Sequence, residues 1–152
     1  MPAKFLIIAA KFNDLITKAL LAGAHEVFAE AGVGSDDVDT LWVPGAFELP
    51  VVAAKAAASK RYAAIITLGA VIRGDTPHFE FVAGECARGL MDTSRETGIP
   101  VIFGVLTTDT VEQALGRCGI KSGNKGADAA RAALSMAKVM DQLSQLTGPR
   151  KA

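Results

Sequence analysis

Residues 4–10, with the sequence KFLIIAA, decide the fold class of this chain. A short apolar run of this kind is typical of a buried β-strand. It is followed by a segment with helical periodicity, residues 14–31, whose apolar side chains fall on one face. Gly32 and Gly34 then end the predicted helix. The chain therefore opens with a strand–helix unit of the kind that builds parallel sheets.

The same alternation of strand and helix continues to the end of the chain. Predicted strands cover residues 38–43, 63–70 and 101–106, and predicted helices cover residues 48–59, 77–97 and 125–146. Thr76 and Pro77 are the predicted N-cap and first helical residue of the helix that follows the loop 71–77. Asp109 and Glu112 have capping-box spacing and open one further short helix.

This order of elements predicts an α/β fold, a flavodoxin-like three-layer α/β/α sandwich around a central four-stranded parallel sheet. We expect a single domain over residues 1–152, with loose tails at 1–3 and 148–152. In such folds ligands bind beyond the carboxyl ends of the strands. The segments that should gather at that edge are residues 11–13, 44–48, 71–78 and 107–109.

The composition excludes several classes of partner. The chain carries 16 basic and 16 acidic side chains, and a net charge of zero argues against a nucleic-acid or membrane-surface binder, which would show a basic excess. Cys86 and Cys118 match no metal-ligand spacing and no disulfide framework, which favours reduced thiols. The sequence has neither the plan of a signal peptide nor an apolar run long enough to span a membrane, so we expect a cytoplasmic location.

The most informative segment after a strand is RGDTPH, residues 73–78. Gly74 lets a ligand approach the backbone closely, and the free amides of the next helix start suit an anion. Thr76 adds a hydroxyl, and His78 can pass protons beside that anion. The alternative is an ordinary capped helix with a surface histidine. The glycine, the threonine and the position after a strand together favour a functional site.

Other segments hold candidates that are ambiguous when taken alone. Phe12 can stack on a flat heterocycle, although a core position is the simpler interpretation. Glu48 can bind a polyol or an amine, or it can be a helix-start carboxylate favoured by the helix dipole. Arg117 and Lys125 flank a glycine-bounded loop and can hold phosphate or a carbonyl oxygen, with solvated charges as the alternative. Phe103 lies inside a predicted strand and is by default a core residue.

A set of segments, taken in order and spacing, resembles the lumazine synthase family, formally 6,7-dimethyl-8-ribityllumazine synthase. These segments are KFN at 11–13, VPGAFELP at 43–50, GAVIRGDTPHFE at 69–80, GVLT at 104–107 and GNKG at 123–126. Each is weak alone, but their combination is highly specific, and the likeness extends over nearly the whole chain. The resemblance implies a transferase that condenses 5-amino-6-(D-ribitylamino)uracil with 3,4-dihydroxy-2-butanone 4-phosphate. The product, 6,7-dimethyl-8-ribityllumazine, would form with release of phosphate and water in the penultimate step of riboflavin biosynthesis, without a metal or a cofactor.

The resemblance also implies roles for individual residues. The uracil substrate would be bound by Phe12, Ala46, Phe47, Glu48, Ala70, Val71, Ile72, Phe103 and Lys125. The butanone phosphate would be held by Asp75, Thr76 and Arg117, while His78 would shuttle protons. Phe103, Arg117 and Lys125 match family positions that a neighbouring subunit supplies.

The resemblance implies a homopentamer, because a site shared between subunits requires one. The short segment 117–126 is similar to that of family members that close pentamers into a 60-subunit icosahedral shell, for which riboflavin synthase is a candidate partner. Two rival functions remain. A flavodoxin-like signalling receiver needs a cluster of acids after the first strand, where this chain has only Asp14. A lumazine- or flavin-binding or cage protein without activity is disfavoured because His78, Arg117 and Lys125 are all present.

Overall fold

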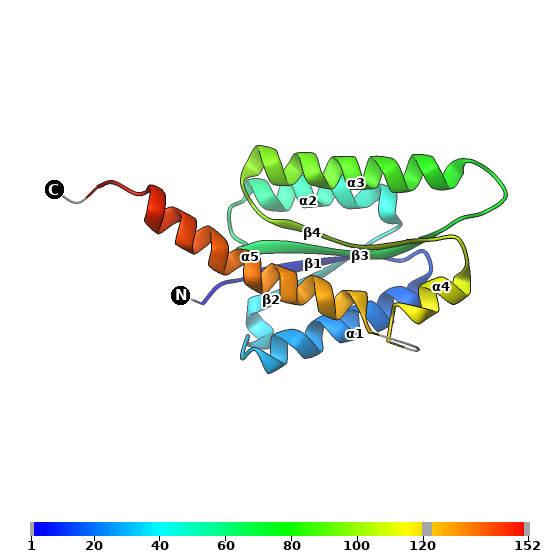
Figure 1. Ribbon diagram of the computed structural model, residues 1–152, viewed down its shortest axis with the longest axis horizontal. Coiled ribbons are helices and arrows are strands. Elements are labelled where there is room, and N and C mark those ends of the chain that lie inside the picture. Colours follow the sequence, from blue (N-terminus) through cyan, green and yellow to red (C-terminus); the bar gives the residue numbers. More distant parts are fainter. Residues whose placement is uncertain (1, 120–122, 151–152) are drawn as a thin grey trace.

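A computed structural model of the chain describes residues 2–119 and 123–150. Its sheet has the strand order β2-β1-β3-β4, and every pair of neighbouring strands is parallel (Figure 1). The strands are β1 (Phe5–Ala10), β2 (Val38–Val43), β3 (Ala64–Ile72) and β4 (Val101–Thr108). The predicted central four-stranded parallel sheet is therefore confirmed.

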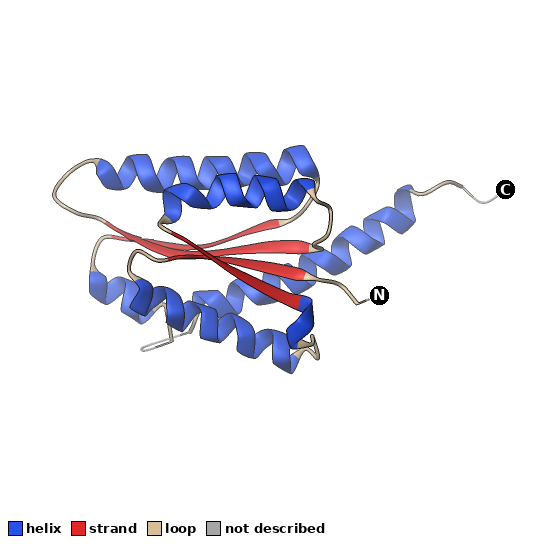
Figure 2. Cartoon of the chain, turned by 180° about the vertical axis from the view of Figure 1, so that it is seen from behind, coloured by secondary structure: helices blue, strands red, loops and turns tan. Residues whose placement is uncertain are grey.

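Helices cover both faces of this sheet, as Figures 1 and 2 show from opposite sides. Helices α2 and α3 lie together on one face, and α1 and α5 pack against each other on the opposite face, with the short α4 beside them. The helices are α1 (Asp14–Glu30), α2 (Leu49–Ala58), α3 (His78–Thr97), α4 (Val111–Gly116) and α5 (Lys125–Thr147), and 3₁₀ turns cover Ser35–Asp37 and Ala46–Glu48. The predicted flavodoxin-like three-layer α/β/α sandwich is confirmed.

Strand β1 is buried along its whole length, which explains why its sequence is a continuous apolar run rather than an alternating one. Phe5 and Ile7 point into the core beneath α1 and α5, where Phe5 packs on Phe28 with ring centroids 4.9 Å apart. Leu6 and Ile8 point to the other face and pack beneath α2 and α3. The sheet therefore separates two cores, and each helical layer is held by burial of its own apolar stripe.

Strands β3 and β4 are longer than the sequence predicted, because they pair with each other beyond their apolar segments. The predicted ends were residues 70 and 106, but the ladder continues with Val71 opposite Thr107 and Ile72 opposite Thr108. Val71 and Ile72 are therefore strand residues, and the prediction of a loop from residue 71 was wrong for these two. The loop after β3 begins only at Arg73, whose backbone N–H still donates to the Thr108 carbonyl at 2.8 Å.

Three predicted helix starts are displaced by one residue. Helix α3 begins at His78, so Pro77 is its N-cap rather than its first residue, and Thr76 only accepts a long 3.4 Å bond from the His78 N–H. Helix α4 is capped by Thr110, not Asp109, because the Thr110 hydroxyl accepts from the Gln113 N–H at 3.1 Å. The Gln113 side chain accepts a bond from the Asp109 N–H at 2.8 Å, so it bonds to the residue before the N-cap rather than to the N-cap itself as in a capping box. Helix α2 likewise starts at Leu49, after the 3₁₀ turn.

The outer end of α5 projects beyond the sheet (Figure 1), and its residues 141–147 are exposed. None of the helices described in residues 2–119 and 123–150 has the length and apolarity needed to cross a membrane. Residues 2–3 and 148–150, which belong to the predicted tails, form neither helix nor strand. The other predicted tail residues, 1 and 151–152, lie outside the described residues.

Candidate active site

The segments that follow the strands are tied to one another at the carboxyl edge of the sheet. The backbone N–H groups of Lys11 and Phe12 donate to the carbonyls of Val43 and Pro44, at 2.8 and 3.0 Å. Asn13, in the left-handed conformation with φ 61°, donates from Nδ2 to the Ala70 carbonyl at 2.9 Å. These bonds fix the turn after β1 against the end of β2 and against β3, near the carboxyl ends of these strands.

A cavity of about 360 Å³ opens at this edge, and we call it the aromatic cavity. It is lined by Phe12, Gly45, Ala46, Phe47, Glu48, His78, Phe81 and Val82. The side chains of Phe12 and Phe47 are 70% and 60% exposed, so their rings are available for contact with a ligand. The ambiguity about Phe12 is thereby resolved, because it lies in this cavity rather than in either core.

Gly45 allows the turn after β2 to approach the Phe12 ring. A Cβ at this position would lie 2.5 Å from Phe12 Cδ2 and 3.3 Å from Glu48 Oε1, closer than atoms in proteins normally approach. A side chain at residue 45 would therefore displace the ring. The PGAFE turn thus needs a glycine because the Phe12 ring leaves no space for a Cβ. The backbone conformation does not require one, since the φ of −153° at Gly45 is ordinary extended backbone.

Phe81 also lines the aromatic cavity, although the sequence pattern did not predict it as a site residue. The predicted apolar stripe of α3 contains its neighbours Phe79 and Val82, whereas Phe81 falls outside that stripe and is 66% exposed. An exposed phenylalanine one turn after a candidate catalytic histidine is the signal that could have identified it.

A second cavity of about 400 Å³ lies along β4 and the start of α5, and we call it the cationic cavity. It is lined by Phe103, Gly104, Val105, Leu106, Thr107, Thr108, Gln113, Arg117 and Lys125. Arg117, Lys125 and Gln113 also line an adjoining cavity of about 560 Å³, together with Glu112 and Asp128. Phe103 is 44% exposed there, so it is not the core residue that its position in a strand suggests.

The aromatic and cationic cavities share no lining residue within one chain. The structure brings Phe12, Ala46, Phe47, Glu48 and His78 together in one, and Phe103, Arg117 and Lys125 together in the other. An arrangement in which a single chain places Arg117 beside His78 is therefore not observed.

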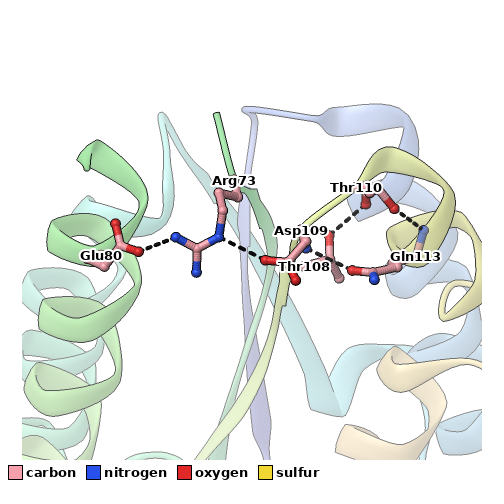
Figure 3. Close-up of polar contacts among 6 residues, drawn as sticks. All are labelled: Arg73, Glu80, Thr108, Asp109, Thr110 and Gln113. Atoms are coloured by element: carbon pink, nitrogen blue, oxygen red, sulfur yellow. Dashed lines mark hydrogen bonds and ion pairs between the residues drawn. The ribbon is translucent and has the colours of Figure 1, made fainter. Parts of the chain in front are cut away.

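The Arg73 side chain connects the end of β4 to the first turn of α3 (Figure 3). Its Nε donates to Asp109 Oδ1 at 2.8 Å at the end of β4, and its Nη1 pairs with Glu80 in the first turn of α3. Its guanidinium lies 4.4 Å from the centroid of the Phe79 ring. The hydrogen bonds to Asp109 and Glu80 raise the pKa of Arg73, and the bond from Arg73 lowers the pKa of Glu80. Arg73 therefore ties the helix start that carries His78 to β4.

Comparison with known proteins identifies the family of the chain. The family model described as 6,7-dimethyl-8-ribityllumazine synthase matches residues 2–141. A protein named 6,7-dimethyl-8-ribityllumazine synthase from Nitratidesulfovibrio vulgaris (strain DSM 19637 / Miyazaki F) is 54% identical over 140 residues, which cover 92% of this chain and 90% of that protein. The chain belongs to the 6,7-dimethyl-8-ribityllumazine synthase family. This confirms the resemblance found in the sequence and the predicted enzyme class, a transferase of riboflavin biosynthesis.

In this member of the lumazine synthase family, the remaining predicted site residues lie outside the two named cavities. Asp75 and Thr76 are exposed in the loop between β3 and α3. Ala70 is buried at the end of β3, where its carbonyl is occupied by Asn13, and Val71 and Ile72 are half-buried beyond it. Their assignment to either substrate remains a prediction.

Within residues 2–119 and 123–150, no group of His, Cys, Asp and Glu side chains is arranged to hold a metal ion. Cys86 and Cys118 are free and buried. Burial raises the pKa of the Cys86 thiol to about 11, so very little of it is thiolate at neutral pH. In this lumazine synthase family chain neither of these thiols is a candidate nucleophile.

Proposed function

We propose that the chain condenses 5-amino-6-(D-ribitylamino)uracil with 3,4-dihydroxy-2-butanone 4-phosphate to form 6,7-dimethyl-8-ribityllumazine, in the penultimate step of riboflavin biosynthesis. Family membership supports a reaction of this type. The observation that carries the proposal is the aromatic cavity, in which three exposed phenylalanine rings lie beside Glu48 and His78. A flat heteroaromatic substrate with a polyol chain needs a stacking surface and a carboxylate, and this cavity offers both.

The uracil substrate would stack on the Phe12 ring and extend its ribityl chain past residues 46–48. Glu48 is half-buried in the cavity wall, where its carboxylate can accept hydrogen bonds from ribityl hydroxyls. The backbone and apolar edges of residues 70–72, at the end of β3, would contact the pyrimidine ring. Phe103 and Lys125 of a neighbouring subunit would close the site from the other side.

The butanone phosphate would lie at the start of α3. This helix has 20 residues, and no side chain of its N-cap residue accepts a hydrogen bond from the amides of the first turn. Its N-terminal amides and dipole favour an anion there. Asp75 would contribute a backbone amide and Thr76 an amide and its hydroxyl, while Arg117 of a neighbouring subunit would pair with the phosphate oxygens.

His78 would move the protons of this reaction. The 5-amino group attacks the ketone carbon of the butanone, and loss of water gives an imine. Elimination of phosphate and ring closure by the ribityl-bearing nitrogen, with loss of a second water, complete the pyrazine ring. Each step transfers protons, and an exposed imidazole in the cavity wall is suited to giving and accepting them.

Positioning would contribute more to the rate than proton transfer. Holding two reactants in attack geometry can remove about 7–11 kcal/mol of the barrier, whereas a general acid–base contributes about 10²–10⁴-fold. The reaction requires no metal or cofactor in this scheme, because imine formation between an amine and a ketone is intrinsically easy.

The proposal includes a homopentamer in which each site combines the aromatic cavity of one subunit with the cationic cavity of the next. The separation of the two cavities within one chain supports this assembly, because Arg117 needs another subunit to reach His78. Closure of pentamers into a 60-subunit shell that houses riboflavin synthase is a further expectation. Residues 120–122, part of the segment on which it rests, lie outside the described residues. The buried free thiols fit a reducing, cytoplasmic compartment.

The decisive experiment is to mix the two substrates with the protein and to follow the absorbance and fluorescence of the lumazine product. Product formation above the uncatalysed rate is the expected result. If no product forms while lumazine or riboflavin binds, the chain is a binding or cage protein instead. Light scattering tests the assembly, and a monomer at assay concentration would contradict the shared site.

A further inference from the structure

Asn124, the residue immediately before Lys125, has a side chain that bonds to three separate backbone groups. Its Nδ2 donates to the carbonyl of Ala19 in α1 at 3.0 Å and to the carbonyl of Cys118 at 3.1 Å. Its Oδ1 accepts from the Ala127 N–H at 3.0 Å, which caps α5. The amide thus joins α1, the segment after α4 and the start of α5 at one point.

The backbone around Asn124 pairs the two cationic residues of the site. Cys118 and Asn124 form an antiparallel bridge, and the Lys125 N–H donates to the Arg117 carbonyl at 2.9 Å. Arg117 and Lys125 are therefore neighbours beside this isolated bridge, and both line the cationic cavity. The Asn124 side chain connects that bridge to α1 by a hydrogen bond.

Helix α1 is shaped to receive this amide. A Cβ at Gly23 would lie 2.5–2.6 Å from the Cγ, Oδ1 and Nδ2 atoms of Asn124. Gly23 is buried in the middle of α1, where alanine would otherwise favour the helix. The glycine therefore leaves space for Asn124, at a position remote from it in sequence.

We propose that Asn124 is a positioning residue for Arg117 and Lys125, anchoring the cationic half of the site to α1 through its two donated hydrogen bonds. It contacts no substrate in this scheme. The inference rests on the proposed function for the identity of the ligands, but the anchor itself is a property of this chain. Loss of the anchor should weaken anion binding at Arg117 while leaving the helix cap intact.

Asn124→Asp is the sharpest test, because it replaces the Nδ2 donor by a charged oxygen of similar size and keeps the capping acceptor for Ala127. It removes both donated bonds and sets a carboxylate oxygen against two carbonyls. We expect the KM for the butanone phosphate to rise about tenfold in the wild-type background and less than about twofold in an Arg117→Ala background, because the two residues act as a unit. Equal effects in the two backgrounds, or wild-type KM values for Asn124→Asp, would overturn the proposal.

Gly23→Ala provides an independent route to the same defect from α1. It should reproduce the KM change of Asn124→Asp without altering any residue of the site. If the clash prevents folding, Gly23→Ala with Asn124→Ser relieves it while still lacking both donated bonds to Ala19 and Cys118. That double variant should fold and keep the raised KM, and a wild-type KM would contradict the anchor.

Ser94→Ala is the matched control. The Ser94 hydroxyl donates to the Ile99 carbonyl at 3.0 Å and accepts from the Val101 N–H at 3.3 Å, at the edge of the sheet opposite the site, so its loss costs two part-buried hydrogen bonds without touching the cationic cavity. Its KM values should remain those of the wild type, and a rise matching that of Asn124→Asp would show a general loss of stability instead.

Affinity for inorganic phosphate, measured by calorimetry on the assembled protein, separates this proposal from the proposed function. If wild type binds phosphate and Asn124→Asp weakens that binding as Arg117→Ala does, the anchor holds even if no lumazine forms. If Arg117→Ala weakens it and Asn124→Asp does not, the anchor is wrong while the proposed reaction can stand.

Discussion

The aromatic cavity at the carboxyl edge of the sheet and the cationic cavity along β4 are built in different ways. The aromatic cavity exposes its rings, and its turns are held by hydrogen bonds between loop backbones, such as Phe12 N–H to the Pro44 carbonyl. The cationic cavity depends on the close packing of α5 against α1, at Gly126 and through Asn124. The exposed rings of the aromatic side can therefore change with little effect on folding, whereas the geometry of the cationic side is part of the core.

Gly126→Ala should produce the largest effect. A Cβ at Gly126 would overlap the backbone carbonyl of Leu20 in α1, which cannot rotate away as a side chain can. Separating α1 from α5 should lower the free energy of unfolding by about 3 kcal/mol or more, measured by urea denaturation. Gly84→Ala in α3 is the control, because nothing lies within 4 Å of its added Cβ and a gain of about 0.5–1 kcal/mol is expected. If the two variants are equally stable, the close packing of α5 against α1 at Gly126 does not contribute to folding as proposed.

The same contrast explains which features the sequence could predict. The strands and their order follow from apolar runs such as residues 5–10, because burial on both faces leaves a local signature. The lengths of β3 and β4 do not follow from such runs, because Thr107 and Thr108 become strand residues only through pairing with Val71 and Ile72. A pattern within one segment carries no information about the partner that extends it.

The candidate site also has features that the sequence predicted and features that it did not. His78 and the PGAFE turn were predicted from their positions after strands, and they share the aromatic cavity. The contact of Asn124 with Gly23 joins segments far apart in the sequence, so neither residue type signals it alone. The cap of α4 was misplaced because Asp109 and Thr110 both suit an N-cap, and the tertiary bond of Asp109 to Arg73 decides between them.

His78→Ala should give the largest change in the chemistry of the aromatic side. We expect kcat to fall about 10²-fold without reaching zero, because proton transfer is lost while the positioning of both substrates remains. Steady-state assays should find KM values close to those of the wild type. His25→Ala, which removes an exposed histidine of α1, should retain wild-type turnover. An unchanged rate for His78→Ala, or complete loss despite normal substrate binding, would refute this role.

Arg117→Ala should affect binding on the cationic side. A charge-assisted bond to phosphate contributes about 1.5–3 kcal/mol, so the KM for the butanone phosphate should rise about 10- to 100-fold. The KM for the uracil substrate should change much less. Arg95→Ala, which removes an exposed arginine near the end of α3, should leave both constants unchanged. If Arg117→Ala raises both KM values equally, the assignment of Arg117 to the phosphate is wrong.

Gly45→Ala should produce the smallest effect and test whether the aromatic side tolerates change as proposed. The added Cβ would displace the Phe12 ring, which is largely exposed and can rotate away, so the protein should unfold at nearly the wild-type urea concentration. Loss of stacking should raise the KM for the uracil substrate about threefold to tenfold, because an aromatic pair contributes about 0.5–1.5 kcal/mol. Gly34→Ala, whose Cβ would meet only Asp37 at an ordinary 3.6 Å, should change neither quantity. If only the exposed Phe12 ring has to move, the loss of stability is small. A large loss of stability in Gly45→Ala would therefore show that the aromatic cavity, too, is part of the core.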